Sequence, residues 1–246
     1  MKKLIWIFFL SFSTMIQLEA KVLNAVYSIR YGIFGELGIC KAHLETKGNT
    51  YVIEVSAETT GVVKRLSKNR REKYVSRGHI VKGVFISDSL DMVRSYSNKV
   101  GINHYRIDHQ KKKVIKTSIR KRRGKVYQNE SRVLSFYAKD DLLTLYFNLP
   151  NRINLEKAGE YALPTVGAEK QDGKVKILIP EKKEKKRYEK SLGRGNFHYL
   201  TAIVYQKLFQ SSQGELMIAL GKEGVAEKAV LKDLILYGDL VAKRVK

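Results

Sequence analysis

The chain has 246 residues and carries 47 lysine and arginine residues against 24 aspartate and glutamate residues, a formal charge of +23. Because 43% of its residues are hydrophobic, it can bury a core, which excludes a disordered basic tail. The single cysteine, Cys40, excludes an internal disulfide. We interpret it as a small apolar side chain of the core.

Residues 1–20 have the pattern of a cleavable secretory signal peptide. Lys2 and Lys3 give the segment a positive start, and Leu4–Leu18 is apolar without a charged residue. This region has 15 residues, whereas a spanning helix needs about 20, so an uncleaved anchor is the alternative interpretation. We expect cleavage after Ala20, which places a mature chain with a charge of +22 in the periplasm or cell envelope.

Most of residues 21–246 shows the pattern of β-strands. Strands are predicted at Val22–Tyr31, Ile33–Thr46, Tyr51–Glu58, Arg70–Arg77, His79–Ile86, Val100–Asp108, Val114–Ile119 and Lys125–Asn129. Turn signals such as Arg77-Gly78 and Arg123-Gly124 recur about every ten residues, a spacing that favours antiparallel hairpins over βαβ units.

One amphipathic helix is predicted at residues 140–149. Leu142, Leu145, Tyr146 and Leu149 fall on one face of it, and Asp140-Asp141 would cap its free N–H groups. We expect Pro150 to end this helix. Its apolar face would then pack on the concave side of a curved sheet.

Strand patterns resume after the helix. They cover Val175–Ile179, Tyr199–Phe209, Glu215–Gly221, Lys228–Tyr237 and Leu240–Val245. The segment Val225–Tyr237 is ambiguous, because its apolar residues fit a helix period as well as a strand. The predicted fold class is mainly β: a single domain, residues 21–246, built as a curved antiparallel sheet or partly open barrel packed on one α-helix.

Five short motifs follow one another along the chain. They are Tyr27–Gly38, an aromatic strand leading into two glycines; Tyr51–Gly61, ending in Ala57-Glu58-Thr59-Thr60-Gly61; Tyr74–Ile80, a strand–glycine–strand step; Asp141–Tyr146, an Asp-x-Leu-Thr helix start; and Ala229–Arg244, two strands around Gly238. In this order they resemble the DUF3108 family of exported bacterial proteins, over nearly all of residues 22–246. The chain departs from the family in lacking its usual tryptophans and in having Ala229-Val230 where a proline is expected.

The resemblance implies an exported, β-rich domain with a curved sheet wrapped on a helix, as in lipoprotein carriers. It implies no catalytic residues, because the family has no agreed ones.

Three dense basic clusters are the candidate binding residues. They are Lys111, Lys112 and Lys113; Arg120, Lys121, Arg122 and Arg123; and Lys182, Lys183, Lys185, Lys186 and Arg187. In a cytosolic protein such clusters would indicate nucleic acid, which the export signal argues against. The expected partner is instead a lipid, lipopolysaccharide or a cell-wall polyanion, with peripheral membrane contact. We expect the first two clusters to meet on one hairpin; the alternative is that all three are solvated surface without a partner.

The sequence indicates no catalytic residue, metal site or cofactor. The five histidines lack the short spacing of metal ligands, and we interpret each as a separate surface residue. Neither a nucleophile elbow, a His-Glu-x-x-His motif nor a P-loop is present. Gly193-Arg194-Gly195 is interpreted as a hairpin turn.

Three hypotheses for the function follow. The first is a non-enzymatic binding or carrier module whose hydrophobic or anionic ligand lies between the concave face of the sheet and the helix. The second is a structural or assembly protein that holds an anionic envelope polymer through its basic clusters. The third is an enzyme with an unfamiliar site.

Overall fold

The structure is a computed structural model that describes residues 20–32, 35–204, 214–222, 224–234 and 238–246. The predicted signal peptide lies outside the described residues, apart from Ala20. The strands are β1 (Val22–Tyr31), β2 (Gly35–Lys47), β3 (Thr50–Thr59), β4 (Arg71–Val81), β5 (Val84–Tyr96), β6 (Lys99–Asp108), β7 (Lys113–Arg122), β8 (Lys125–Val133), β9 (Gly159–Pro164), β10 (Lys174–Ile179), β11 (His198–Val204), β12 (Gly214–Leu220), β13 (Ala226–Leu234) and β14 (Gly238–Arg244). The helices are α1 (Gly61–Leu66), α2 (Leu142–Arg152) and α3 (Lys185–Leu192), with two short 3-10 helices, η2 (Glu169–Gln171) and η3 (Lys182–Glu184).

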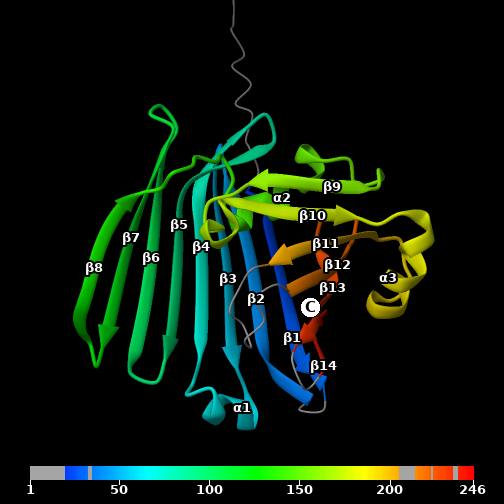
Figure 1. Cartoon of the computed structure of the whole chain (residues 1–246), viewed down its shortest axis with the longest axis horizontal. Helices are drawn as coiled ribbons and strands as arrows, with labels where there is room; N and C mark the ends of the chain where they lie inside the picture. The colour runs from blue at the N-terminus through cyan, green and yellow to red at the C-terminus, as the bar shows by residue number, and fades with distance from the viewer. Residues whose placement is uncertain (1–19, 33–34, 205–213, 223, 235–237) are drawn as a thin grey trace, which may run out of the picture.

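All the strands belong to one antiparallel sheet of 14 strands, in the order β8-β7-β6-β5-β4-β3-β2-β1-β14-β13-β12-β11-β10-β9. The chain therefore starts in the middle of the sheet, builds one half outward to the edge β8, and later builds the other half inward from the edge β9. Figure 1 shows the sheet curling, so that β9–β12 run across the view and β2–β8 run up and down it. The sheet is not closed, which confirms the predicted class.

Helix α2 lies on the segment that joins the two edges of the sheet, and it packs on the concave side (Figure 1). Asp141 is its N-cap: the carboxylate accepts from the backbone N–H groups of Leu143 and Thr144, and the Thr144 hydroxyl completes the capping box. The helix runs to Arg152, so the prediction that Pro150 ends it is wrong. A proline in the last turn removes one hydrogen bond only, and the N–H group of Ile153 still donates to the carbonyl of Leu149 at 3.0 Å.

The sheet surrounds α2 on several sides. Leu145 and Leu149 are buried against Ile177, Leu200 and Ile218 of β10–β12. On another side of the helix, Leu143 and Phe147 pack with buried residues of β2 and β3, namely Leu44, Tyr51 and Ile53. These strand residues mark the inner face of the sheet; their alternate neighbours lie on the outer face.

The outer face of the C-terminal strands is covered by α3. Tyr188 and Leu192 of this helix are buried against Tyr199, Met217 and Val230 of β11–β13. The sequence predicted a single helix, and α1 and α3 are additional. Helix α3 was missed because six of its eight residues, Lys185–Leu192, are charged or serine, which hid its two buried side chains. The ambiguous segment Val225–Tyr237 contains the strand β13, and residues 235–237 lie outside the described part.

Candidate functional site

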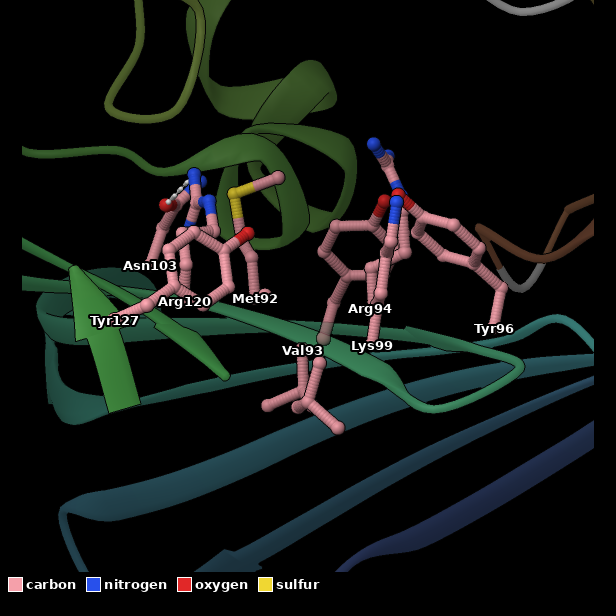
Figure 2. Close-up of a pocket in the computed structure, with 11 residues that line it drawn as sticks. Met92, Val93, Arg94, Tyr96, Lys99, Asn103, Arg120 and Tyr127 are labelled. Carbon is pink, nitrogen blue, oxygen red and sulfur yellow. Dashed lines mark hydrogen bonds between the residues drawn. The ribbon is translucent and has the colours of Figure 1, made fainter. Parts of the chain in front are cut away.

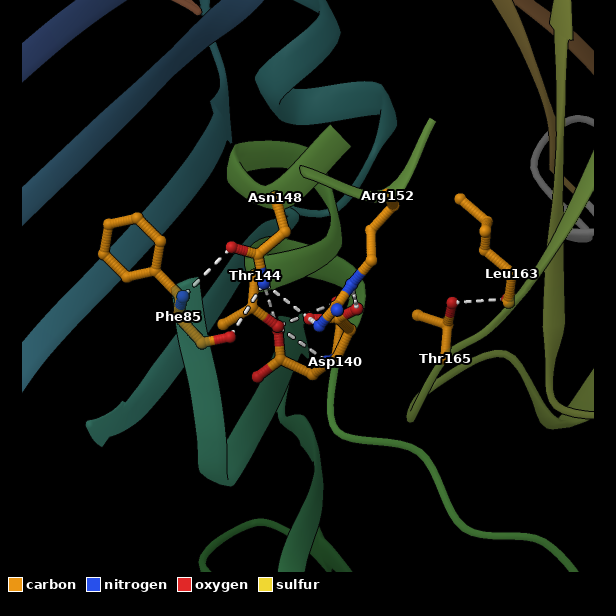
Figure 3. Close-up of polar contacts among 8 residues, drawn as sticks. Phe85, Asp140, Thr144, Asn148, Arg152, Leu163 and Thr165 are labelled. Atoms are coloured by element: carbon orange, nitrogen blue, oxygen red, sulfur yellow. Dashed lines mark hydrogen bonds and ion pairs between the residues drawn. The ribbon is translucent and has the colours of Figure 1, made fainter. Parts of the chain in front are cut away.

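A buried polar network joins the start of α2 to β5 (Figure 3). The amide of Asn148 donates to the Phe85 carbonyl at 2.7 Å and accepts from the Phe85 N–H group at 3.0 Å. Asp140 pairs with Arg152, with 2.7 Å between Oδ2 and Nε, and Ser87 Oγ donates to Asp141 Oδ2 at 2.7 Å. Burial raises the pKa of Asp141, against hydrogen bonds that favour the carboxylate. These contacts hold α2 on the sheet, and we assign them to the fold.

A pocket of about 190 Å³ lies on the inner face of β4–β8, away from this network. We call it the tyrosine–arginine pocket and define it by Tyr74, Arg94, Tyr96, Lys99, Arg120 and Tyr127. Figure 2 shows the labelled residues from Met92 to Tyr127 projecting from one side of the sheet, whereas Val93 points to the other. Strand alternation explains this, because Met92, Arg94 and Tyr96 occupy every second position of β5.

Arg120 is held in a fixed position on the floor of the pocket. Its guanidinium donates to the carbonyls of Ile102 and Ile119, each at 3.0 Å, and to Asn103 Oδ1 at 3.0 Å. Its side chain lies over Gly101, where an added Cβ would already touch it at 3.5 Å. Within the described part of the chain, no carboxylate forms an ion pair with Arg120, so its charge is directed to carbonyl and amide oxygens alone.

Glu72 is the acidic group beside the pocket. Its carboxylate accepts from Arg70 at 2.6 Å, from Arg94 at 2.9 Å and from the Tyr74 hydroxyl at 2.6 Å. Burial alone would raise the pKa of Glu72, but the Tyr74 hydrogen bond and the Arg94 and Arg70 contacts outweigh it and hold this pKa below its ordinary value. Glu72 is therefore ionised near neutral pH, yet it faces two arginines, and the pocket keeps an excess of positive charge.

Lys99 lies at the rim of the pocket, where β5 turns into β6. Its ammonium is 5.8 Å from the centre of the Tyr96 ring, in the range of a cation–π contact. Tyr127 stands across the pocket on β8, at a bulge where two residues of β8 oppose one of β7, and it is 62% exposed. Aromatic rings and cationic groups thus face the same space from five neighbouring strands, β4–β8.

The first two predicted basic clusters lie at opposite ends of β7. Lys111 and Lys112 are in the turn before β7 and Lys113 begins it, whereas Arg122 ends it and Arg123 is in the next turn. At roughly 3.3 Å per residue, Lys113 and Arg120 are about 23 Å apart along the strand. The expectation that the hairpin brings the two clusters together is wrong, because both ends of a strand cannot meet in one hairpin.

Strand alternation also divides the second cluster. Arg120 and Arg122 are on the inner face, and Lys121 is on the outer face. Of the predicted binding residues, Arg120 lines the tyrosine–arginine pocket.

The third predicted cluster lies on η3 and α3, on the outer side of the C-terminal half of the sheet. Lys183 pairs with Glu181 at 2.9 Å, and Arg187 pairs with Glu215 at 3.1 Å. Lys182, Lys185 and Lys186 are exposed and form no ion pair with a described residue. This cluster is therefore separate from the pocket.

Sequence reasoning missed the pocket residues Tyr74, Arg94, Tyr96, Lys99 and Tyr127. A signal was present in the pattern Met92-x-Arg94-x-Tyr96, which places three pocket residues on one face of a strand. What the sequence did not contain was the direction of that face, because both faces of β5 carry polar residues.

Two histidines that were interpreted as separate meet in the structure. The rings of His79 and His109 lie 5.8 Å apart, and Asp88 contacts them at 3.0 and 3.3 Å. A register shift between β4 and β5 next to Gly78 leaves Asp88 without a partner residue on β4. This bulge brings the Asp88 carboxylate to the two histidine rings. In the described part of the chain, no set of histidine, cysteine, aspartate and glutamate side chains has the arrangement of a metal site.

No family model matches the chain, and no curated protein matches it either. Among solved structures, the chain is similar to a beta-barrel-like protein of Domain of Unknown Function DUF1849 from Brucella abortus. The TM-score is 0.53 at 11% sequence identity, and the match covers 91% of this chain and 95% of that chain. This likeness shows the fold alone.

The described helices are all too short or too polar to cross a membrane.

Proposed function

We propose that this protein is a non-enzymatic binding or carrier module of the bacterial cell envelope, exported by its N-terminal segment, and a member of the DUF3108 family that its motifs resemble. Its ligand is a hydrophobic or anionic component of the envelope and binds in the tyrosine–arginine pocket. The observation that carries the proposal is the meeting of Arg94, Lys99 and Arg120 with three tyrosines on a hollowed inner face.

The chemistry of the pocket supports binding. Arginine and lysine recognise carboxylate and phosphate groups through charge-assisted hydrogen bonds, and tyrosine rings offer rigid apolar area at a low cost in side-chain entropy. The titratable groups elsewhere have other roles: Asp141 caps α2, and Asp88 contacts the histidines at the bulge of β5. We therefore assign no reaction to the protein.

The test is to produce the full chain in its host, purify it from the envelope fraction and record its mass under native and denaturing conditions. We expect a chain that begins at Lys21 and a bound component that dissociates on denaturation. Replacing both Lys99 and Arg120 with glutamine should abolish the bound component and leave the cleavage site unchanged, so that the chain still begins at Lys21. A full-length mass in the inner-membrane fraction would mean that the N-terminal segment is not cleaved and anchors the protein. A ligand-free protein that binds no component of an envelope extract would refute the binding module.

The exposed cluster on α3 favours a second candidate function, in which the protein holds an anionic envelope polymer. Lys182, Lys185 and Lys186 lie on one exposed segment without ion-pair partners among the described residues. A polymer could contact them without entering a pocket. Charge neutralisation of this cluster, described in the Discussion, separates the two candidates.

A further inference from the structure

The inner face of the sheet continues from the tyrosine–arginine pocket toward β1 as two rows of side chains. The strand register places Met92, Tyr74, Val55, Ala42 and Ala25 in one row. It places Arg94, Glu72, Ala57, Cys40 and Tyr27 in the row beside it. Each row therefore begins at the pocket and crosses from β5 to β1, and the members beyond β4 are apolar or aromatic.

The middle of these rows, on β3 and β2, is less covered than the positions under α2, whereas the β1 end is covered: Ala25 is 2% exposed and Tyr27 packs against the core cluster of Leu145 and Leu149. Leu44, Tyr51 and Ile53, on the same strands under α2, are 4%, 2% and 1% exposed. By contrast, Ala42, Cys40, Val55 and Ala57 are only half-buried, although they lie in the interior strands of the sheet. Their side chains are small and remain partly accessible on the inner face of β3 and β2.

The length of the rows suits an acyl chain. Three steps between neighbouring strands, each about 4.8 Å, give about 14 Å from β5 to Cys40 on β2. One leaflet of a bilayer is roughly 15 Å of hydrocarbon. A single acyl chain that leaves the pocket at β5 can therefore lie along the rows as far as Cys40.

The charge of the pocket determines which end of such a ligand binds there. Arg94 and Arg70 share Glu72, whereas Lys99 and Arg120 form no ion pair with a described carboxylate. An anionic headgroup at Lys99 and Arg120 would complement this excess. A neutral or cationic headgroup would leave it uncompensated.

We propose that the ligand of the tyrosine–arginine pocket is a lipid with an anionic phosphate or carboxylate headgroup, bound with the head between Lys99 and Arg120 and the acyl chain along the rows that lead to Cys40. This inference rests on the proposed function and narrows it to one class of ligand and one orientation.

Cys40 provides the measurement, because it is the single cysteine of the chain and stands in the second row, on the inner face. Burial raises the pKa of its thiol to about 11, so thiol reagents should modify it slowly, and a chain lying across it should slow them further. The probes are dodecyl phosphate, dodecyl maltoside with the same chain and a neutral head, and inorganic phosphate. Each is used below the concentration at which micelles form, with the protein freed of bound lipid.

We expect dodecyl phosphate to slow the labelling of Cys40 at least about fivefold and the two other probes to change it by less than about twofold. In a series of alkyl phosphates, the concentration for half protection should fall with chain length, by up to about fourfold per added methylene. The double variant K99Q/R120Q should raise this concentration at least about tenfold. The variant K99Q alone should also raise the concentration for half protection. This keeps the test valid if the double variant unfolds.

The matched control is R106Q/K121Q, which removes one arginine and one lysine from the outer faces of β6 and β7. It should leave protection by dodecyl phosphate unchanged. One contrary result is that dodecyl maltoside protects Cys40 as well as dodecyl phosphate does, and another is that K99Q/R120Q and R106Q/K121Q lose protection equally. Either result would overturn the anionic head and leave the binding module in place. Protection by inorganic phosphate at the same concentration would overturn the acyl chain. No protection by any probe, together with a ligand-free native protein, would refute the proposed function as well.

Discussion

The two halves of the sheet differ in how they are covered, although they belong to one continuous hydrogen-bonded structure. Strands β10–β13 are buried on their inner face by α2 and, from β11 on, on their outer face by α3. Strands β5–β7 pack at one end against Leu143 of α2 and against Ala138 and Val166, and the other end of the inner face of β4–β8 carries the tyrosine–arginine pocket. The covered half stabilises the fold, and the open half carries the pocket in which we propose that the ligand binds.

Composition follows this difference. The strand β12 contains Leu216-Met217-Ile218-Ala219-Leu220, an unbroken apolar run of the kind found in strands that are buried on both faces. The strand β5 instead interrupts its apolar residues with Asp91, Arg94 and Ser95 toward the pocket end. Charged side chains in β5 therefore mark the region where solvent or a ligand, and not a helix, faces the sheet.

The largest expected effect is on the covered half. Leu145→Ala should lower the free energy of unfolding by about 2–5 kcal/mol, because Leu145 is 4% exposed between α2 and β10–β12. Met92→Ala, at the half-buried edge of the pocket, should cost less than about 1 kcal/mol. Urea unfolding of both variants checks this, and equal losses would mean that the two halves are covered alike.

A pH-dependent effect is expected at the pocket. The pKa of Glu72 is lowered in the folded state, so its contribution to stability is present above the ordinary value of about 4.5 and is lost as the pH falls through the folded value. Glu72→Gln should cost about 1–3 kcal/mol near neutral pH, and the difference from the unaltered protein should shrink as the pH falls below about 4.5.

The control for Glu72 is Glu54→Gln on the outer face, where the carboxylate pairs with Lys73 at 2.8 Å on an exposed surface. Such surface pairs contribute about 0–1 kcal/mol. Unfolding curves at several pH values would contradict the assignment of Glu72 if its effect proved independent of pH or no larger than that of Glu54.

A smaller effect is expected from the basic clusters outside the pocket. Replacing Lys182, Lys185 and Lys186 with glutamine, or Lys111, Lys112 and Lys113, should each weaken binding to anionic vesicles less than about twofold at 150 mM salt, because exposed charges are screened beyond about 8 Å. Vesicle co-sedimentation checks this. A tenfold loss for the cluster on α3 alone would favour the polymer-holding function over the pocket.

The smallest effect is expected at Tyr146 of α2. Its hydroxyl is buried and has no hydrogen-bond partner among the described residues. Tyr146→Phe should therefore change the free energy of unfolding by less than about 1 kcal/mol or raise it, since no hydrogen bond is lost and no polar group remains buried. A loss above about 2 kcal/mol in thermal or urea unfolding would show that this hydroxyl is paired.

The sequence by itself determined the elements that rest on local patterns. Alternation and turn residues predicted most of the antiparallel strands, and Asp141 predicted the start of α2, because strand periodicity and N-capping involve residues close together in the chain. The turn predicted at Arg77-Gly78 is wrong, because Gly78 lies inside β4 and the chain turns at residues 82–83, and β9 was not predicted. The excess of positive charge was also evident, and Arg120 was among the residues selected from it.

Only the tertiary structure decided which of these residues meet. The register of β4–β8 placed Arg94, Lys99 and Arg120 on one face, whereas Lys121 faces away and Lys113 lies at the far end of β7. The fold also brought His79 to His109 and buried two residues of the otherwise charged α3. These contacts depend on pairing between strands that are distant in sequence, and a one-residue change of register would turn every side chain to the opposite face.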